Sequence, residues 1–434
     1  MAETFLTEAM AARLPPGAVR SLHALGELAD RRKTGAYVVG GLVRDLLLDR
    51  DTYDLDVVVE EAVESFAQAA AAELDGEIKA RSRFGTVLLV LRDGTKLDLA
   101  TSRSEVYARP GALPDVRFGA IGADLSRRDF TINAMAIRLN AATFGALLDP
   151  HGGRDDLEHQ VIRVLHEKSF EDDPTRILRA VRFEARLGFT LEDDTRALLL
   201  ATARAGYLSR VSGERIRNEI ELILGEPAPG SSVRVLDDWG ILRAVAEGWS
   251  LPEQWERICA DILELLESPP APCAVEERWT ALLAAMLLAV GPETRLAVGE
   301  RLVLGRRALR IVSQLERLET TAGPALASAD SLAPSEVRTR LDGFEPEILV
   351  LASAVGRGSP LEERIALYLK ELRHVRPALT GDDLRQLGIV EGERIGTLLR
   401  ALLIARLDGV VETRQDELSL ARRLARELDD SGGN

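Results

Sequence analysis

The sequence predicts an α+β protein, in which an N-terminal domain with a mixed β-sheet and flanking helices is followed by an all-α region. Between residues 35 and 140, short β-rich runs alternate with helical ones and are separated by Gly and Asp turns. From about residue 155 onward, Leu, Ala, Arg and Glu dominate and β-branched runs are few, which favours helices. The length of 434 residues exceeds one ordinary core and indicates about two to four units.

Short runs rich in β-branched residues are expected to form the strands of the first domain, at residues 37–39, 55–59, 86–91 and 96–100. Later breaks between helices are expected where Pro and Gly cluster, at residues 226–232, 268–273 and 376–381. No internal repeat is visible in the sequence.

Composition is typical of a folded protein, because hydrophobic residues make up 46% and charged residues 29% of the chain. The longest apolar run, residues 280–290, is well short of the ~20 residues that a membrane span needs. The N-terminus lacks the basic and then apolar pattern of a signal peptide. We therefore expect a cytoplasmic protein without a membrane partner.

Cysteine and histidine are too sparse for most schemes that depend on them. Cys259 and Cys273 form no CxxC pair and lie near no histidine cluster, which argues against a structural zinc site or a disulfide. Five histidines in the whole chain argue against a histidine-based triad or metal hydrolase. Catalysis is therefore expected to depend on carboxylates.

The formal net charge of −15 is unusual for a protein that grips nucleic acid, because such proteins carry a basic footprint. Charge can nevertheless be local. Arg176, Arg179, Arg182 and Arg186 recur at helical spacing, which predicts a basic helix within an acidic chain. The alternative is a solvated helix surface.

The strongest catalytic signal lies in residues 37–60, which read as strand, Gly-Gly turn, short helix, turn and strand. Gly40 and Gly41 would let backbone N–H groups approach a phosphate at the start of the helix. Arg44 adds a positive charge one turn later. Asp54 and Asp56 stand two residues apart at the start of a strand, so both side chains project from one face.

Paired carboxylates of this kind hold divalent metal ions. Metal-assisted phosphoryl transfer uses one Mg²⁺ to lower the pKa of an attacking hydroxyl and another to stabilise the leaving pyrophosphate. Asp54 and Asp56 are therefore predicted to be catalytic and to ligate Mg²⁺, as two ions. Asp98, in the run at 96–100, is the candidate for a third ligand, and the alternative is an ordinary edge-strand charge.

Each part of this motif has a simpler explanation alone, because Gly-Gly is often only a turn and paired aspartates often only begin a strand. Together, about ten residues apart in a strand–helix–strand context, they favour a nucleotide site. The pattern is neither a Walker A loop nor a GxGxxG fingerprint.

The runs GGLVRD and DLDVVV, at residues 40–45 and 54–59, resemble the head of the class II tRNA nucleotidyltransferase and bacterial poly(A) polymerase family, within the DNA polymerase β-like superfamily. The run DLSRRDFTINAMA, at 124–136, is similar to the family's second motif, whose Arg-Asp pair contacts the ribose and phosphates. The resemblance assigns the following residues to nucleotide binding: Gly40, Gly41, Arg44, Asp45, Arg127, Arg128, Asp129 and Asn133.

Asp129 and Asn133 stand four residues apart, which would place them on one face of a helix and suit them to sugar hydroxyls. The alternative for this pair is a helix cap and a surface contact.

The run EDDPTR, at residues 171–176, resembles the family's EDxxR motif, which reads the incoming base. Aligned on Asp173 and Arg176, the leading Glu is replaced by Asp172, a supporting residue, and Arg179 follows as a further nucleotide contact. Cytosine and adenine both present an amino donor beside a ring-nitrogen acceptor, so an Asp acceptor beside an Arg donor selects CTP and ATP. The alternative is that Asp173 only caps the helix that Pro174 begins, which would leave Arg176 exposed.

Residues 210–224 resemble the family's next motif, with Ser212 as the expected N-cap of a helix. Glu214 and Arg215 are expected to brace the base-reading helix, and the alternative is a simple solvated first turn. Residues 376–418 resemble the tail that follows the catalytic core in many bacterial members, which implies contact with tRNA.

The resemblance implies four domains: a catalytic nucleotidyltransferase head (1–150), a helical neck that recognises the base (151–230), a helical body (231–375) and a helical tail that binds tRNA (376–434). Residues 240–370 are readable only as helices, and no accessory hydrolase motif is visible.

The implied function is template-independent addition of CMP and AMP from CTP and ATP to the tRNA 3′ end, with pyrophosphate release. The expected partners are the tRNA acceptor end and the two nucleotides, and the oligomeric state is not predicted. The alternatives are an enzyme that adds only CC or only A, a poly(A) polymerase, an inactive RNA-binding relative and a small-molecule nucleotidyltransferase. Residues 107–124 lie where the family's flexible loop governs the switch from C to A. Their Pro and Gly content predicts a mobile loop but does not indicate which nucleotide is added.

Overall fold

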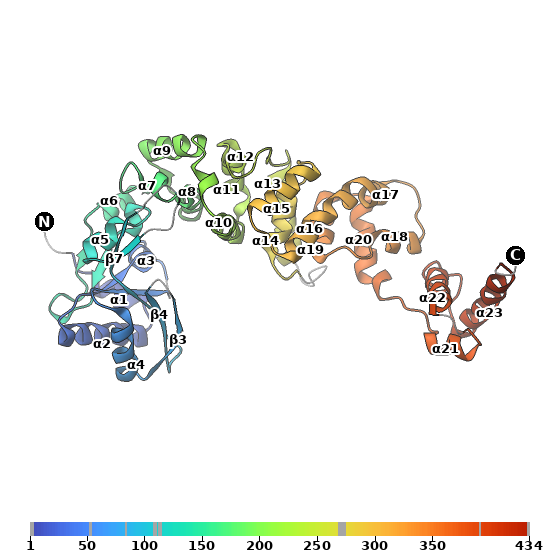
Figure 1. The fold of residues 1–434 in the computed structure, drawn as a ribbon, viewed down its shortest axis with the longest axis horizontal. Coiled ribbons are helices and arrows are strands. Elements are labelled where there is room, and N and C mark those ends of the chain that lie inside the picture. The colour runs from blue at the N-terminus through green and yellow to red at the C-terminus, as the bar shows by residue number, and fades with distance from the viewer. Residues whose placement is uncertain are drawn as a thin grey trace. The chain divides into compact units, whose positions relative to one another are not determined.

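The structure is a computed structural model that describes residues 4–51, 54–82, 85–106, 111, 115–267, 275–389 and 392–431. The chain folds as two compact units, Met1–Ile220 with Asp238–Val245 and Glu221–Asp237 with Ala246–Asn434. The strands belong to the first unit, and the described part of the second is helical (Figure 1). The α+β fold class is therefore confirmed, whereas the division into four domains stays a prediction.

A mixed sheet of seven strands forms the centre of the first unit, in the order β3-β4-β5-β2-β1-β8-β9. Its neighbouring strands are antiparallel, except β2 and β5, which run parallel. The strands are β1 Ala36–Val39, β2 Leu55–Val59, β3 Gly76–Arg81, β4 Thr86–Leu91, β5 Lys96–Thr101, β8 Ala136–Arg138 and β9 Leu147–Leu148. Two short pairs are separate from it: β6 Arg103–Val106 with β7 Asp115–Phe118, and β10 Val161–Ile162 with β11 Thr190–Leu191.

Helices pack against this sheet. The helix α4 contacts β3, β4 and β5, and α2 contacts β1. Ile121 and Leu125 of α5 form a buried cluster with Tyr37, Val39 and Val58. The helices of the first unit are α1 Thr7–Arg13, α2 Pro16–Arg32, α3 Gly41–Leu47, α4 Val63–Glu73, α5 Ile121–Ser126, α6 Gly153–Glu158, α7 Ser169–Asp172, α8 Thr175–Leu187, α9 Asp193–Arg204 and α12 Ile241–Val245, with 3₁₀ turns η1 Thr131–Asn133, η2 Ala141–Thr143 and η3 Tyr207–Arg210. Helix α10, Gly213–Gly225, crosses into the second unit.

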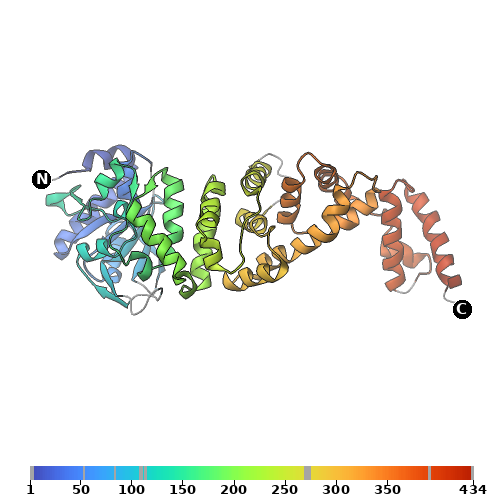
Figure 2. The same cartoon turned by 90° about the horizontal axis from the view of Figure 1, so that it is seen from above.

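The second unit is built from helices that pack on one another, both neighbours in the chain and helices farther apart in the sequence (Figure 2). Helices α13, α14 and α19 contact one another and enclose much of its apolar interior, with Trp255 fully buried. The helices are α11 Pro229–Asp238, α13 Trp255–Glu267, α14 Arg278–Met286, α15 Pro292–Arg301, α16 Arg306–Arg317, α17 Gly323–Ala327, α18 Pro334–Leu341, α19 Pro346–Val355, α20 Pro360–Lys370, α21 Gly381–Gln386, α22 Gly392–Leu407 and α23 Arg414–Ser431, with the π-helical turn η4 Leu318–Ala322 and the 3₁₀ turn η5 Leu372–His374.

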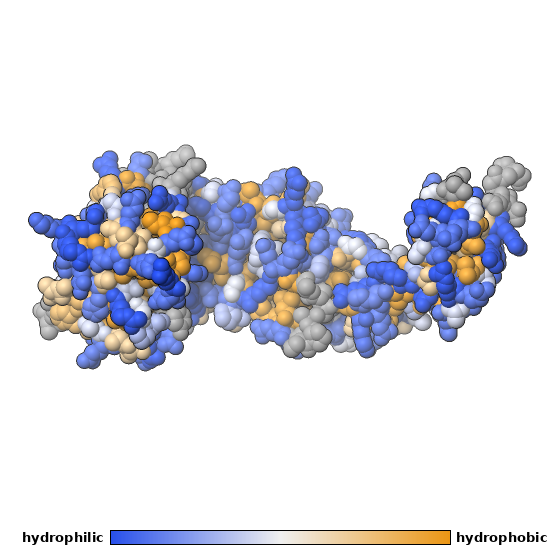
Figure 3. Space-filling view, turned by 90° about the horizontal axis from the view of Figure 1, so that it is seen from below, coloured by the Kyte–Doolittle hydropathy of each residue, from blue (hydrophilic) through white to orange (hydrophobic). Residues whose placement is uncertain are grey.

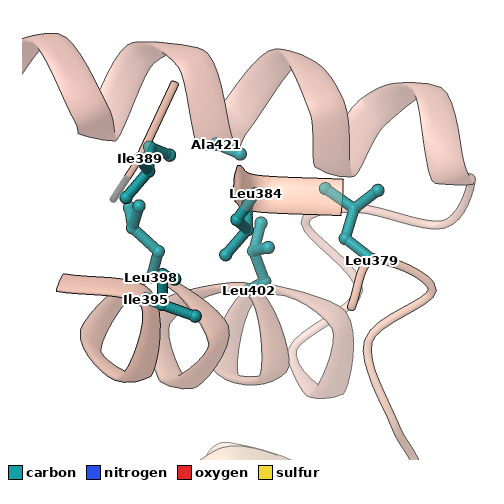
Figure 4. Close-up of a cluster of buried hydrophobic side chains, with 7 residues drawn as sticks. All are labelled: Leu379, Leu384, Ile389, Ile395, Leu398, Leu402 and Ala421. Atoms are coloured by element: carbon teal, nitrogen blue, oxygen red, sulfur yellow. The ribbon is translucent and has the colours of Figure 1, made fainter. Parts of the chain in front are cut away.

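The helices α21, α22 and α23 enclose an apolar cluster of their own, which we call the tail core (Figure 4). The carboxylate of Glu417 is fully buried beside it and accepts hydrogen bonds from the backbone nitrogens of Ala378 and Leu379, at 3.0 and 2.9 Å, and from Arg406. The tail core consists of Leu379, Leu384, Ile389, Ile395, Leu398, Leu402 and Ala421.

Within the described ranges, no helix combines the length and apolarity that crossing a membrane requires. On the face shown in Figure 3, hydrophilic residues predominate and apolar residues form separate areas between them. Scattered apolar residues of this kind are ordinary for a folded surface. The run at 280–290 belongs instead to the interior, because α14 is buried along most of its length.

Candidate active site

A cavity of about 630 Å³ in the first unit gathers the predicted motifs. Its size suits a small-molecule ligand such as a nucleotide. The lining residues come from segments spread along the chain between the Gly-Gly motif and α10. They are Gly40, Gly41, Leu42, Arg44, Asp45, Asp54, Asp56, Arg103, Glu105, Val116, Arg127, Arg128, Asp129, Asn133, Asp173, Arg176, Arg179, Phe183, Arg186 and Arg215.

Eight of these residues are arginines and six are carboxylates, so the cavity is locally basic although the chain carries a net charge of −15. Such a field concentrates anions at one place on an acidic molecule. The cavity includes every residue that the sequence assigned to nucleotide binding, but not Asp98, Asp172 or Glu214. That the lining residues bind a nucleotide stays a prediction.

The paired aspartates lie where β2 begins. Val58 packs against α5, and alternate residues of a strand lie on the same face of the sheet. Asp56, two residues before Val58, therefore lies on the face that α5 covers. Asp98 is its direct partner in the parallel pair of β2 and β5. Since β5 lies between β4 and β2, the alternative of an edge-strand charge for Asp98 is wrong.

The pKa values of Asp56 and Asp98 are both raised. Although Asp56 is exposed to the cavity, loss of surrounding water and the charges of Asp98 and Asp54 raise its pKa to about 6, against the opposing charge of Arg128. Desolvation and Asp54 likewise raise the pKa of Asp98. Among the described residues, no three His, Cys, Asp or Glu side chains come close enough to hold one metal ion together. Asp98 as a third ligand therefore stays a prediction without geometric support.

The Gly-Gly turn brings backbone close to an arginine. Gly40 has a φ of +72°, and a Cβ there would lie 3.0 Å from Nη1 of Arg128. A side chain at this position would therefore meet both backbone strain and a cavity-lining guanidinium. Arg44 is itself buried and donates to Asp45 and to Oδ1 of Asn133, each at 2.8 Å, so it connects the first two motifs.

The second motif is organised by a carboxylate that the sequence reading did not single out. Asp124 is fully buried and accepts hydrogen bonds from Arg127 at 2.7 Å and from Arg128 at 2.9 Å. Burial alone would raise its pKa, but the two guanidinium groups outweigh burial and lower the pKa of Asp124 below its ordinary value. Asp124 therefore holds both arginines at the cavity as an ionised group.

The prediction that Asp129 and Asn133 share a face of an α-helix is wrong, because the 3₁₀ turn η1 begins only at Thr131. Oδ1 of Asp129 accepts from the backbone nitrogen of Phe130 at 2.8 Å and from Nδ2 of Asn133 at 3.0 Å. Such local side-chain bonds compete with helix formation. The two side chains are nevertheless in contact, and both line the cavity.

A charged network joins this motif to α8 and α10. Nη2 of Arg179 donates to Oδ2 of Asp129 at 2.6 Å, and Nη1 donates to Glu219 at 3.3 Å. Glu219 also lies 3.6 Å from Arg182. Burial would raise the pKa of Asp129, but the charge and hydrogen bonds of Arg179 prevail and lower it to about 2. Arg179 is thus held in place from two elements.

The motif that the sequence predicts to read the base lies at the start of α8. Asp173 caps it, since Oδ1 accepts from the backbone nitrogen of Thr175 at 3.1 Å, and the helix begins just after Pro174. Arg176, however, is buried and donates to Oγ of Ser169 at 2.5 Å and to the carbonyl of Arg127 at 2.6 Å. The alternative of an exposed Arg176 is therefore wrong.

The amphipathic α8 also explains the spacing of its arginines. Ile177, Leu178 and Val181 are buried in the first unit, and the helix ends at Gly188, whose φ of +73° suits glycine. Arg176, Arg179 and Arg186 line the cavity, whereas Arg182 is buried beside Glu219. The alternative of a solvated helix surface is therefore wrong for Arg176 and Arg182, while Arg186 is exposed.

The first turn of α10 braces α8, as predicted for Arg215. Its Nη2 donates to both carboxylate oxygens of Asp173 at 2.8 Å. Ser212 directly precedes α10, as predicted for its N-cap, while Glu214 is exposed. Asp172 lies outside the cavity, and its carbonyl accepts from the backbone nitrogen of Gly111 at 3.3 Å.

Several functional candidates were missed in the sequence. Glu219 could have been found from its place in the motif at residues 210–224, and Asp124 from its place in the second motif. Phe183 reads as an ordinary core residue, although three arginines surround its ring: Arg44, Arg179 and Arg182. The prediction of a mobile loop at 107–124 lies partly outside the described residues, as does Cys273.

Comparisons with known proteins agree with this arrangement. Residues 36–163 match the family described as the poly A polymerase head domain. Residues 188–253 match the probable RNA and SrmB-binding site of polymerase A.

Named relatives match most of the chain. An A-adding tRNA nucleotidyltransferase from Geobacter sulfurreducens is 36% identical over 95% of this chain, although the chain spans only 48% of that relative. An A-adding tRNA nucleotidyltransferase from Halalkalibacterium halodurans is 34% identical, and the match covers 92% of this chain and 91% of the relative. A CC-adding tRNA nucleotidyltransferase from Geobacter sulfurreducens is 33% identical over 90% of this chain and 92% of its own length.

Solved structures extend the comparison to the fold. An apo CCA-adding enzyme matches with a TM-score of 0.86 and 33% identity, covering 98% of this chain and 100% of the other. A Thermotoga maritima CCA-adding enzyme complexed with tRNA matches with a TM-score of 0.79, 31% identity and the same coverage. Complexes of a CCA-adding enzyme with ATP and with CTP match at 32% identity, with TM-scores of 0.82 and 0.83 and 96% of this chain covered. The chain therefore belongs to the tRNA nucleotidyltransferase and poly(A) polymerase family.

Proposed function

We propose that this protein adds AMP, CMP or both, from ATP and CTP, to the 3′ end of tRNA without a nucleic-acid template and releases pyrophosphate. The observation that carries the proposal is the shared cavity, in which Asp54 and Asp56 meet Asp173 and Arg176 of a distant helix. A carboxylate pair for phosphoryl transfer thus faces a carboxylate and arginine that suit the pairing edge of a base. The solved relatives bound to tRNA, ATP and CTP support the same substrates, and the cytoplasmic location is part of the proposal.

The donor set at Asp54 and Asp56 fits a divalent cation, and the Mg²⁺ pair expected from the sequence belongs to this proposal. Hard oxygen ligands suit Mg²⁺. The pKa of Asp56 is raised first by desolvation and then by the charges of Asp98 and Asp54, and a bound cation would offset both effects. When bound there, the metal would supply Lewis-acid stabilisation of the charge that develops at phosphorus.

The protein's own groups then hold the nucleotide. Arg128, anchored by Asp124, and Arg179, anchored by Asp129, present fixed positive charge toward the phosphates. Asp173 offers its carboxylate to the exocyclic amino group of adenine or cytosine, while Arg215 fixes its orientation. This protein scaffold replaces a template strand.

Within this reaction, we infer that terminal adenosine addition is the specific role. The A-adding relatives from two bacteria, at 36% and 34% identity, support it. The CC-adding relative, at 33%, makes CC addition the alternative within the family.

The decisive experiment supplies labelled CTP and ATP, singly and together, to tRNAs ending at the discriminator base, at C or at CC. A non-tRNA oligomer serves as the control. Addition of one A to the tRNA that ends in CC, without C addition, is the expected result. A complete CCA from both nucleotides would contradict A-only specificity, and long A tracts on the oligomer would indicate a poly(A) polymerase.

The affinity of the protein for Mn²⁺, a probe for the divalent site, is expected to fall as the pH falls. Because the pKa of Asp56 is about 6, its carboxylate is protonated below that pH, and protons compete with the metal. Competition from this one proton should weaken Mn²⁺ binding about tenfold at pH 5 relative to pH 8. Isothermal titration calorimetry at the two pH values measures the affinity. Asp56→Asn should bind weakly at both pH values, whereas wild-type affinity without pH dependence would contradict the assignment.

Arg176→Lys is expected to increase incorporation of UTP and GTP about tenfold relative to ATP. The planar guanidinium of Arg176 donates to both Ser169 and Arg127, and a lysine cannot form both hydrogen bonds. The side chain at position 176 would therefore no longer be held in place beside Asp173. Incorporation ratios on a tRNA ending in CC measure the effect. Arg186→Lys, a cavity-lining change on the exposed end of α8, is the control, and unchanged selectivity in Arg176→Lys would refute the base-reading role.

A further inference from the structure

The ribbon of β6 and β7 carries an exposed aromatic side chain beside the cavity. Phe118, the last residue of β7, is 74% exposed, and none of the large apolar side chains in the described residues is more exposed. Rings of this size contribute most when they are covered. The exposure of Phe118 therefore points to a partner that covers it.

The strand register places Phe118 on the side of the ribbon that faces the cavity. Phe118 pairs with Arg103, and Val116 pairs with Glu105. Alternate residues of a strand share a face, and directly paired residues share it too, so these four side chains lie together. Since the other three line the cavity, the ring of Phe118 extends the same surface outward.

Polar contacts hold the ribbon beside the cavity. Oε1 of Glu105 accepts from Nη1 of Arg127 at 2.9 Å and lies 3.1 Å from Nη2 of Arg103. Beyond β6, Gly111 donates its backbone N–H to the carbonyl of Asp172, which immediately precedes the base-reading Asp173. The ribbon is thus held by the second motif through Glu105 and by the third motif through Gly111, at the end away from Phe118.

We propose that Phe118 is a stacking platform for the base at the 3′ terminus of the RNA acceptor. This inference rests on the proposed function. The reaction brings two bases to one cavity, and the incoming base is assigned to the corner of Asp173 and Arg176. The ribbon contributes other lining residues, Arg103, Glu105 and Val116, and is left for the second reactant, whose 3′-hydroxyl has to reach the same carboxylates. An aromatic ring accepts any base face, so it orients the terminus without reading its identity.

The test is steady-state kinetics of the full chain on a tRNA ending in CC and on the same tRNA whose last nucleotide is an abasic ribose with its 3′-hydroxyl. Stacking of one base on an aromatic ring corresponds to about 5- to 150-fold in affinity. Phe118→Ala should therefore raise the KM for the intact tRNA by about that factor while leaving the KM for ATP unchanged. Phe118→Trp should restore the wild-type KM, and Phe5→Ala, at another exposed ring, should have no effect.

The abasic tRNA separates stacking from a structural role. With no terminal base to cover the ring, Phe118→Ala and the wild type should have the same KM for it. An equal penalty on both RNAs, a rise in the KM for ATP instead, or no change on the intact tRNA would overturn the inference. Failure of the wild type to extend any RNA would overturn the proposed function as well, so the two failures are distinguishable.

Discussion

Asp56→Asn is expected to lower the rate of nucleotide transfer at least about 1,000-fold while leaving the fold intact. Asp54 and Asp56 are the carboxylate pair that we propose as the metal ligands, and the metal stabilisation that they would support is worth several kcal/mol in the transition state. An amide is a much poorer ligand than a carboxylate, so both metal binding and transfer should fail together. Single-turnover transfer of labelled ATP measures the loss.

The same substitution is expected to stabilise the protein at pH 8. Because the pKa of Asp56 is raised from 3.8 to about 6, its ionisation disfavours the folded state above that pH and has no cost below about pH 4. Asp56→Asn removes the cost, so its melting temperature should exceed that of the wild type at pH 8 and approach it at pH 4. Glu64→Gln, an exposed carboxylate on α4, is the control for both measurements, and transfer at the wild-type rate by Asp56→Asn would exclude the proposed chemistry.

Asp129→Ala is expected to destabilise the first unit by about 3–5 kcal/mol, the usual cost of leaving the partner of a buried ion pair uncompensated. Asp129 is buried, accepts from Arg179 at 2.6 Å and from Asn133 at 3.0 Å, and faces the cavity. Its loss frees Arg179 from one of its two anchors, so affinity for ATP should fall as well. Urea unfolding at pH 7 and ATP titration measure the two effects.

The pH dependence gives this second prediction a distinct signature. The pKa of Asp129 is lowered to about 2, so its stabilising contribution is present above about pH 4 and is lost as the pH falls toward 2. The difference between wild type and Asp129→Ala should therefore shrink in acid. Glu158→Ala removes an exposed pair with Arg154 and should cost under about 1 kcal/mol. An equal loss in both variants would contradict the buried-pair explanation.

Local sequence patterns were enough to predict much of the fold. The runs at 55–59 and 86–91 are strands with those bounds, because each alternates buried and accessible positions or is buried along most of its length. Residues of all four motifs line one cavity, although more than 150 residues of sequence separate Gly40 from Arg215. Side-chain chemistry in a short run was enough to predict each part.

The parts that escaped prediction depend on contacts between distant residues. The strand β3 has few buried positions of its own and forms by pairing with β4, so its composition did not reveal it. The spacing of Asp129 and Asn133 predicts a helix. Instead, the side chain of Asp129 accepts a hydrogen bond from the backbone nitrogen of Phe130, and the chain forms a turn there. Glu219 looks like one more charge on a helix until α10 is packed beside Arg179 and Arg182.

The tail core has a consequence for how the polypeptide acquires its structure. Its apolar side chains all lie between Leu379 and Ala421, so ordering them closes only short loops. The sheet of the first unit instead needs β1 to pair with β8, where Val38 meets Ile137 across a much longer stretch of chain. Folding rates rise as contacts become more local, so the helical end is expected to form within milliseconds and the sheet to set the pace. Formation of the sheet, and with it the cavity, is therefore expected to be the rate-limiting step in folding of a newly made chain.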